Sequence, residues 1–288
     1  MKRRPYRAGS FYDADPDACR RAAAGLLAEA SVPADLPATL YGGLVPHAGW
    51  VFSGRTAAAT FKALAERGRL DRVVLFGADH WGLADGAAVG ETGTWETPLG
   101  SVPIDEDLAR SILDASDAAR PDGRAHAREH SIEVQLPLMQ ILAPDVRIVP
   151  INVSPDGRAV AIGRAVGEVL KAFPDAAVVG STDLTHYGPQ YGFVPAGSGA
   201  AGIEWARDND RRILDLVESM RAGEIVPETA ERMNACGGGA IAATVAACAT
   251  LGAARGICLE YTSSAEVMQR VYRQQADDAV GYAAVVFA

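Results

Sequence analysis

Three of the five histidines in the sequence share one context. His47, His80 and His186 each follow an apolar, strand-like run, in the segments LVPHAGW, VLFGADHWG and VVGSTDLTHYG, and each stands two residues before a glycine that allows a sharp turn. Ligands bind at the carboxyl ends of the strands in an open α/β sheet, so we expect these imidazoles at one sheet edge, close enough to share a metal ion. For any one of them, a hydrogen-bonded and partly buried histidine is the alternative.

The other two histidines, His126 and His130, lie four residues apart in RAHAREHSIEVQLPL. On a helix this spacing would place them on one face, with Glu133 beyond His130. The string HAREH also matches the H-x-x-E-H zinc motif of inverzincins, which needs a continuous helix and a carboxylate ligand downstream. Ser131, however, is typical of an N-cap that starts a helix after His130. A supporting or acid–base role for one of these histidines, or a surface loop, therefore stands beside the zinc interpretation.

Cys236 precedes three glycines and an Ala-rich, helix-like run in ACGGGAIAATVAACATLG. A helix N-terminus favours the thiolate, which makes this residue a candidate metal ligand or nucleophile; a small residue packed at a tight turn is the alternative. Cys248 and Cys258 fall in an apolar helix and an apolar strand, where we expect them to be inert. The four cysteines form no C-x-x-C pair, and their spacing predicts no disulfide framework.

Two aspartates precede these histidines. Asp183, three residues before His186, is expected either to orient an imidazole or accept a proton, or to cap a turn. Asp79 directly precedes His80 and is a candidate hydrogen-bond partner for a ligating ring, because metal-bound histidines usually donate their second N–H to a carboxylate or carbonyl.

The elements that must position these residues alternate along the chain. Strand-like runs cover residues 40–45, 73–77, 86–90, 146–151, 177–181, 256–261 and 280–287, and helix-like stretches cover residues 16–30, 55–67, 105–115, 132–143, 158–173, 203–222 and 238–251. Runs such as VVLFG are continuously apolar, which indicates strands buried on both faces. We predict an α/β protein, a three-layer α/β/α fold with a largely parallel or mixed central sheet.

Local signals refine this prediction. Asp15 followed by Pro16 is a well-matched helix start, and Pro137 predicts a kink or a late start in the stretch 132–143. Residues 188–202 are rich in Gly, Pro and Ser, and they predict a surface loop or lid because strand–helix alternation resumes after them. We therefore expect a single domain over residues 1–288.

Composition limits the function classes. The 288 residues are 49% hydrophobic and 22% charged, which excludes a disordered protein, and their net charge of −9 argues against nucleic acid as a partner. No apolar segment typical of a secretory signal follows the basic N-terminus, and the longest weakly polar stretch, 240–254, is too short to cross a bilayer. We expect no membrane association and a cytoplasmic location. The lysines stand in no G-x-x-x-x-G-K loop, which excludes a P-loop NTPase.

Blocks of sequence in order along nearly the whole chain resemble the Memo (mediator of cell motility) family, known in prokaryotes as AmmeMemoRadiSam system protein B. They are AGSFY (8–12), VPHAGWVFSG (45–54), WETPLG (95–100), AHAREHSIEVQLPL (125–138), STDLTHYG (181–188), ACGGG (235–239) and VGYAAVVF (280–287). The chain departs from the family's usual pattern at Asp79 and Trp81, where relatives usually carry Ser and a basic or polar residue, and in YTSSAEV, which lacks the usual Ser-Gly-Asp.

The resemblance implies a fold shared with class III extradiol ring-cleaving dioxygenases, which hold Fe(II) with two histidines and a glutamate. In Memo-like proteins the corresponding ligands are two histidines and a cysteine, which match His47, His80 and Cys236. Fe(II) is the ion expected first, because two imidazoles and one anionic ligand leave open positions on it. Cu and Zn are the alternatives, because a thiolate softens the site.

The remaining matches concern the pocket. His186 matches the acid–base catalyst of the dioxygenases, His130 a further pocket histidine and Asp183 a pocket carboxylate. We therefore predict a non-haem metal protein with redox or dioxygenase-like activity on a small chelating substrate, in which His186 moves a proton.

Two other functions compete with this prediction. One is a non-catalytic protein that binds a small ligand or a peptide and keeps a vestigial metal site, and the other is a zinc hydrolase built on His126 and His130. The family resemblance also implies a radical-SAM protein and an AMMECR-domain protein as system partners.

Overall fold

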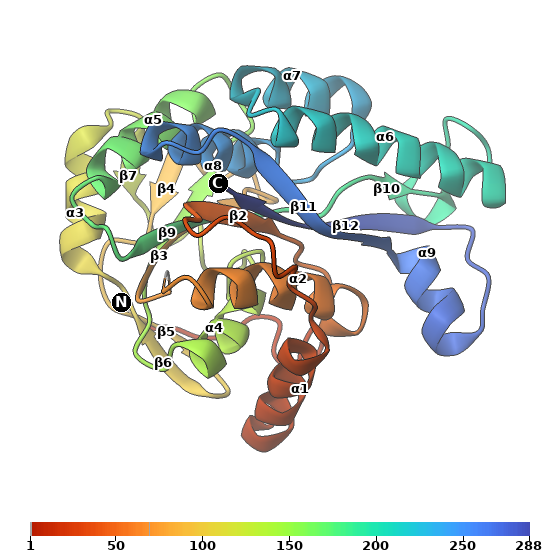
Figure 1. Cartoon of the computed structure of the whole chain (residues 1–288), viewed down its shortest axis with the longest axis horizontal. Helices are drawn as coiled ribbons and strands as arrows, with labels where there is room; N and C mark the ends of the chain where they lie inside the picture. Colours follow the sequence, from red (N-terminus) through yellow and green to blue (C-terminus); the bar gives the residue numbers. More distant parts are fainter. Residues whose placement is uncertain (1, 69) are drawn as a thin grey trace.

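A mixed β-sheet forms the centre of the computed structural model, which describes residues 2–68 and 70–288 (Figure 1). Four parallel strands make its middle, in the order β2 (Gly42–Val45), β9 (Ala176–Ser181), β3 (Arg72–Ala78) and β8 (Arg147–Val153). Every residue of β2 and β9 is buried, which explains why these strands are continuously apolar or small.

Antiparallel pairing begins on both sides of this parallel centre. On one side β12 (Ala279–Phe287) pairs with β2 and also with β10 (His186–Tyr187) and β11 (Gly256–Ser263). On the other side β4 (Ala87–Val89) pairs with β8, and β7 (Ala119–Pro121) then pairs parallel to β4. The sheet is therefore mixed, with the parallel strands at its middle.

Helices cover both faces of the sheet and complete the α/β/α layers (Figure 1). One layer contains α1 (Pro16–Glu29), α2 (Trp50–Ala65) and α4 (Leu136–Leu142), and α2 packs on β2, β11 and β12. The other layer contains α5 (Ala159–Leu170) and α8 (Gly238–Leu251), and α8 packs across β2, β3, β8 and β9. Beside these lie α6 (Ala200–Glu218) and α7 (Ala222–Arg232), whereas α3 (Glu106–Ala115) packs on α5.

The contact between α5 and α8 depends on small residues. A Cβ atom at Gly163 would lie 2.1 Å from the carbonyl oxygen of Ala243, and one at Gly167 would lie 2.7 Å from that of Ala247. The Ala-rich sequence of α8 is therefore a consequence of close packing on both of its sides, since Gly238 to Cys248 are all buried.

Some of the predicted helix boundaries are confirmed, and others differ by several residues. Helix α1 starts as predicted, with Asp15 accepting a hydrogen bond from the Ala18 N–H at 2.8 Å. The stretch 132–143 starts late, as a 3₁₀ turn (Glu133–Gln135) followed by α4 with Pro137 in its first turn. Helix α2 begins at Trp50, five residues earlier than predicted, and the predicted helix 203–222 spans α6 and the turn before α7.

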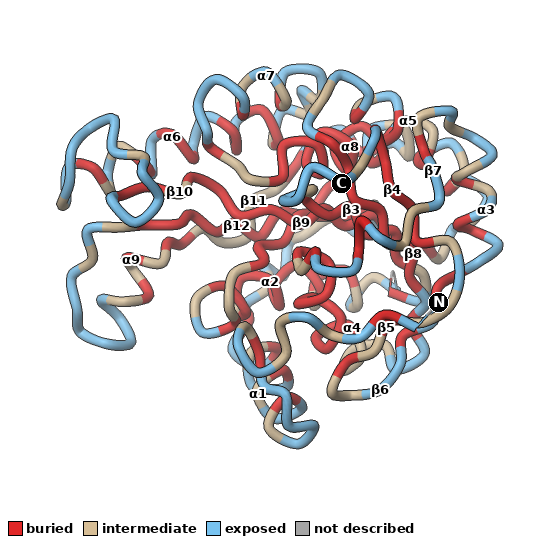
Figure 2. The backbone as a smooth tube through the Cα atoms, turned by 180° about the vertical axis from the view of Figure 1, so that it is seen from behind, coloured by how far each residue is buried: buried red, intermediate tan, exposed pale blue. Residues whose placement is uncertain are grey.

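Short elements complete the structure. A separate three-stranded sheet joins β1 (Lys2–Arg3), β5 (Thr94–Thr97) and β6 (Gly100–Pro103), so the WETPLG segment is a strand entering a turn. After β10 comes a 3₁₀ turn (Pro189–Tyr191), and α9 (Ser264–Val267) continues into a π-helical turn (Met268–Tyr272). Figure 2 shows the red, buried strands at the centre, and the exposed segments around β10 and α9 at one end. Among the described residues, no helix combines the length and apolar character needed to cross a bilayer.

Candidate metal centre

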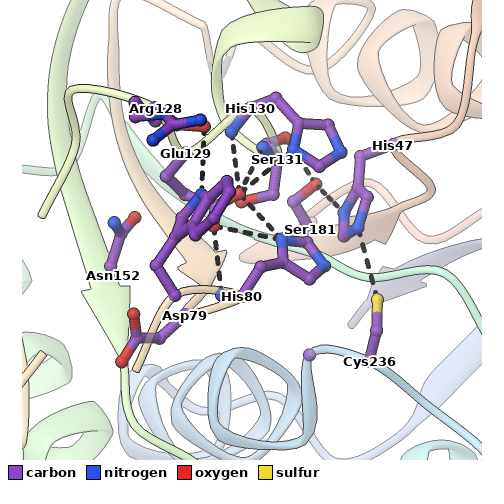
Figure 3. A network of polar contacts seen from close by, with 12 residues as sticks. His47, Asp79, His80, Arg128, Glu129, His130, Ser131, Asn152, Ser181 and Cys236 are labelled. Carbon is purple, nitrogen blue, oxygen red and sulfur yellow. Dashed lines mark hydrogen bonds and ion pairs between the residues drawn. The ribbon is translucent and has the colours of Figure 1, made fainter. Parts of the chain in front are cut away.

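Three imidazole rings lie together beyond the carboxyl ends of β2 and β3 (Figure 3). His47 and His80 each follow their strand by two residues, and their ring centroids are 5.1 Å apart. The third ring belongs to His130, which lies just before the 3₁₀ turn, 5.4 Å from His47 and 5.0 Å from His80. The sheet edge therefore gathers histidines as predicted, although the third of them is not His186.

Cys236, in the segment just before α8, completes the cluster. Its Sγ atom lies 3.3 Å from Nε2 of His47, and one ligand atom from each of Cys236, His47 and His80 lies within 4.8 Å of the others. Two imidazole nitrogens and a thiolate suit Fe, Cu or Zn, so the donor set fits the kind of ion that the family resemblance implies. The described residues thus contain a possible metal-binding site of His and Cys side chains.

Ser181 fixes which nitrogen of His47 faces the cysteine. The Ser181 hydroxyl donates to the carbonyl oxygen of Ser131 at 2.7 Å, so it accepts from Nδ1 of His47 at 3.1 Å. Gln135 donates a second hydrogen bond to the same hydroxyl. Because Nδ1 of His47 is engaged by Ser181, Nε2 is the ring nitrogen that faces Sγ of Cys236.

Glu129 orients the ring of His80 in the same way, by binding its Nδ1 atom. Its carboxylate accepts from Nδ1 of His80 at 2.9 Å and also from the backbone N–H groups of His80, His130 and Ser131. Burial would raise the pKa of Glu129, but the hydrogen bond and charge of His80 outweigh burial and lower it. Burial would lower the pKa of His80, but hydrogen bonds to Cys236 and Glu129 raise it to about 10.

Glu129 was missed as a site residue, and Asp79 is not the partner of His80. The only sequence signal for Glu129 was its place in HAREH, where the motif suggested a zinc helix. The Asp79 carboxylate instead accepts from the backbone N–H groups of Leu83 and Ala84, at 2.9 Å each, and caps the turn after His80.

The backbone around Cys236 is tied to the end of β9. The Cys236 N–H donates to the Asp183 carbonyl oxygen at 3.1 Å, and the Asp183 N–H lies 3.3 Å from Sγ. Burial would raise the pKa of the Cys236 thiol, but the charge of His47 and hydrogen bonds from His47 and His80 lower it to about 6. The position just before α8 adds the favourable field of a helix N-terminus, so the thiolate predominates near neutral pH.

Comparison with known proteins identifies the family. A model of the Memo-like protein family matches residues 3–286. The chain belongs to the Memo-like family. It is 37% identical to a MEMO1 family protein of Methanopyrus kandleri over 299 residues, covering all of this chain and 99% of that protein. It is 41% identical to a MEMO1 family protein of Pyrococcus furiosus over 259 residues, covering 85% of each.

A solved structure supports the fold alone. An uncharacterized protein of Escherichia coli K12 superposes with a TM-score of 0.55 and 12% identity, covering 87% of this chain and all of the other. At this identity the likeness concerns the arrangement of helices and strands, and it carries no conclusion on chemistry.

His186 lies apart from the three rings of this Memo-like chain. Its Nδ1 is 3.0 Å from the carbonyl oxygen of Leu184, and its ring meets Tyr191 edge-on at 5.1 Å. Asp183, only 4% exposed, accepts from the backbone N–H of His47 at 2.6 Å. Asp183 therefore holds the backbone of one cluster histidine, while His186 and Asp183 both line the cavity that opens from the cluster.

His126 is a structural residue, and the zinc-hydrolase interpretation is wrong. Residues 126–130 form turns and no continuous helix, so the two histidines of HAREH do not share a face. His126 is buried, with Nε2 3.0 Å from the Ala88 carbonyl oxygen and its ring packed on Trp95. Burial, aided by the charge of Arg3, lowers its pKa to about 4.

The N-terminal segment forms one wall of the site. The buried carboxylate of Glu133 accepts from Arg3, from the backbone N–H groups of Tyr6 and Arg7, and from the hydroxyl of Tyr12. This network fixes the segment that carries Phe11, which meets the His130 ring edge-on at 5.0 Å. Glu133 is thus a buried anchor of the site wall, a role that its sequence position alone did not reveal.

A cavity of about 1170 Å³ opens from the histidine cluster. His47, His80 and His130 line it at one place, α1 and the start of α2 line one side, and the segments around β10 and α9 line the far end. The cluster is therefore open to a space large enough for a small molecule.

Proposed function

We propose that this Memo-like protein binds one Fe(II) ion through His47, His80 and Cys236 and uses it for redox or dioxygenase-like chemistry on a small chelating substrate. The observation that supports the proposal is the convergence of these ligand atoms within 4.8 Å of one another beside an open cavity. Fe(II) held by three protein ligands keeps open positions for a chelating molecule and for oxidant chemistry. A thiolate ligand also suits Cu(I) and Zn, so metal analysis is part of the test.

The chain's own residues prepare the ligands in this proposal. Glu129 and Ser181 each hold one imidazole with its Nδ1 proton engaged, which directs Nε2 of His80 and of His47 toward the ion. The low pKa of Cys236 supplies the thiolate without strongly alkaline conditions.

Proton transfer in this proposal belongs to His186, with His130 and Asp183 beside it. The contact of its Nδ1 with the Leu184 carbonyl oxygen leaves Nε2 as the atom that takes or gives a proton to a molecule in the cavity. His130 also lines the cavity, and burial together with the charge of His47 lowers its pKa to about 3. His130 is therefore neutral at physiological pH and acts as a hydrogen-bond partner of the substrate beside His186.

The test is anaerobic titration of metal-depleted protein with Fe(II), Cu(I) and Zn(II), combined with elemental analysis. His47→Ala and Cys236→Ser are expected to lose the bound ion, whereas Cys258→Ser, which changes a cysteine outside the cluster, retains it. Wild-type stoichiometry and affinity in both cluster variants would overturn the metal site.

A non-catalytic ligand- or peptide-binding protein is the competing function. It predicts no oxygen uptake with catechols, and a ligand affinity that survives Cys236→Ala. Association with a radical-SAM protein and an AMMECR-domain protein is a further proposal that rests on the family resemblance, and co-purification of the three from one cell tests it.

A further inference from the structure

We propose that Arg3 is a positioning residue of the metal centre. Its guanidinium holds the turn at 126–129, which carries Glu129, the hydrogen-bond partner of His80. The inference rests on the proposed function, since His80 is one of the three proposed metal ligands. It gives the basic N-terminal segment a part in the orientation of a ligand that lies far from it in the sequence.

Arg3 is a buried cation between exposed neighbours. Lys2 and Arg4 on either side of it are exposed, whereas only 2% of the Arg3 side chain is exposed. Its strand β1 pairs with β5, and its guanidinium lies over the indole ring of Trp95, 4.1 Å from the ring centroid. A charge at such a depth is retained only when it is paired and hydrogen-bonded, so the partners of Arg3 indicate what it does.

Two of these partners are main-chain carbonyl groups of the turn at 126–129. Nε of Arg3 donates to the His126 carbonyl oxygen at 2.7 Å, and Nη2 donates to the Glu129 carbonyl oxygen at 2.6 Å. His126 and Glu129 are each 1% exposed, and the turn belongs to no helix or strand. Because buried carbonyl groups need donors and no helix supplies them here, Arg3 closes the turn.

The turn that Arg3 closes is the one that orients His80. The Glu129 carboxylate accepts from Nδ1 of His80 at 2.9 Å (Figure 3). Arg3 thus holds the main chain of Glu129, while the side chain of Glu129 binds the ring. A hydrogen bond weakens steeply when its length or angle changes, so a displacement of the turn would release the ring. Arg3 therefore acts on the metal ligand through Glu129.

A third contact connects the turn to the wall of the site. Nη2 of Arg3 also donates to Oε2 of Glu133 at 2.8 Å, in an ion pair whose two side chains are almost completely buried. A lysine can keep this ion pair, but its single nitrogen lacks the planar fork that binds two carbonyl groups at the same time. The exchange of Arg3 for lysine therefore separates the fixing of the turn from the buried ion pair.

The experiment compares Arg3→Lys with Arg72→Lys in the full chain. Arg72 pairs with Asp105 at 2.9 Å, and it lies at the start of β3, at the end of the strand that is away from His80. Anaerobic competition with a chelator measures the affinity for Fe(II) and for Zn(II). We expect Arg3→Lys to weaken the binding of both metals about fivefold, as the loss of one buried hydrogen bond implies, and Arg72→Lys to match the wild type.

Amide hydrogen exchange of the metal-depleted protein, followed by NMR, gives a readout that needs no metal. Arg3→Lys should increase the exchange rates of the His80 and His130 amides about fivefold, because both amides donate to the carboxylate of Glu129. Arg72→Lys should leave these two rates unchanged.

A second variant serves if Arg3→Lys does not fold. Arg3→Gln combined with Glu133→Gln removes both members of the buried ion pair, so that neither charge is left without its partner. The same losses of metal affinity and of amide protection are expected, because glutamine offers one amide nitrogen in place of the guanidinium fork.

The two proposals fail in different ways. Unchanged exchange rates in the Arg3 variant would overturn the inference whatever the metal result, and wild-type metal affinity despite faster exchange would overturn the link to the ligand. An equal loss of metal affinity in Arg72→Lys would show a general effect of lower stability and would also overturn it. Failure of the proposed function would instead appear as unchanged metal binding in His47→Ala and Cys236→Ser, while the faster exchange in Arg3→Lys persisted.

Discussion

The carboxylate of Glu129 accepts the Nδ1 proton of His80 at 2.9 Å, and the same carboxylate accepts three backbone N–H groups. The ring of His80 is therefore oriented by a group that is itself rigidly held. A histidine oriented in this way presents one nitrogen to a metal without having to reorganise, and its anionic partner makes that nitrogen more basic.

Glu129→Gln tests this relationship. The amide keeps the shape of the side chain but removes its charge, so we expect metal affinity to fall by about 10- to 100-fold, with little change in the fold. Competition with a chelator of known affinity measures it. Asp79→Asn is the matched control, because Asp79 caps the turn beside His80 without contacting the ring, and its variant should bind metal like the wild type. Equal affinity in Glu129→Gln would contradict the orienting role.

Alkylation of the metal-free protein tests the state of Cys236. Its pKa of about 6 predicts that the iodoacetamide reaction rate at this residue rises through pH 6 and is nearly constant above pH 7. Burial raises the pKa of Cys258 to about 11, so this cysteine should react slowly across the same range. Peptide mass spectrometry separates the two sites. His47→Ala should move the Cys236 midpoint upward, and a wild-type midpoint near 9 would show that the imidazoles do not lower the thiol pKa.

Much of the site could be predicted from the sequence, because the sheet edge dictates it. Continuously apolar runs identified β2 and β3, and a parallel arrangement necessarily brings the residues after them, His47 and His80, to one edge. The fold class followed from the same alternation of strands and helices.

Contacts between distant segments could not be predicted in this way. Glu129 reaches His80 only because the turns at 126–132 pack against the sheet edge, and no periodicity encodes that packing. Ser181 reaches His47 because β9 pairs with β2, and the order of the strands in the sheet is not readable from the periodicity either. The i, i+4 spacing of His126 and His130 suggested one helical face, whereas the turns send one ring into the core and the other to the cavity.

The buried His126 makes a prediction about acid stability. Its pKa is lowered to about 4, chiefly by burial, against about 6.5 in an unfolded chain, so the native state binds fewer protons between these values. Its contribution to stability is complete above about pH 6.5 and is lost as the pH falls toward 4.

From pH 7.5 to pH 5, the free energy of unfolding of the wild type should therefore fall by about 2 kcal/mol more than that of His126→Gln, whose amide can still donate to Ala88. Urea unfolding at the two pH values, in one defined metal state, measures the difference. An equal fall in the free energy of unfolding in the two proteins would show that His126 is not the group responsible.

Two glycine substitutions test why α5 and α8 lie so close together. In an open helix, Gly→Ala stabilises by about 0.5–1 kcal/mol because alanine restricts the unfolded chain and favours the helix. Gly25 in α1 has no atom within 4 Å of its missing Cβ, so Gly25→Ala should show this gain. At Gly163 the new methyl would lie 2.1 Å from the Ala243 carbonyl oxygen, and the helices must separate, so Gly163→Ala should cost about 1–3 kcal/mol. Denaturant unfolding measures the change in the free energy of unfolding, which should be positive for Gly25→Ala and negative for Gly163→Ala. A stabilised Gly163→Ala would mean that α5 and α8 can separate without loss of stability.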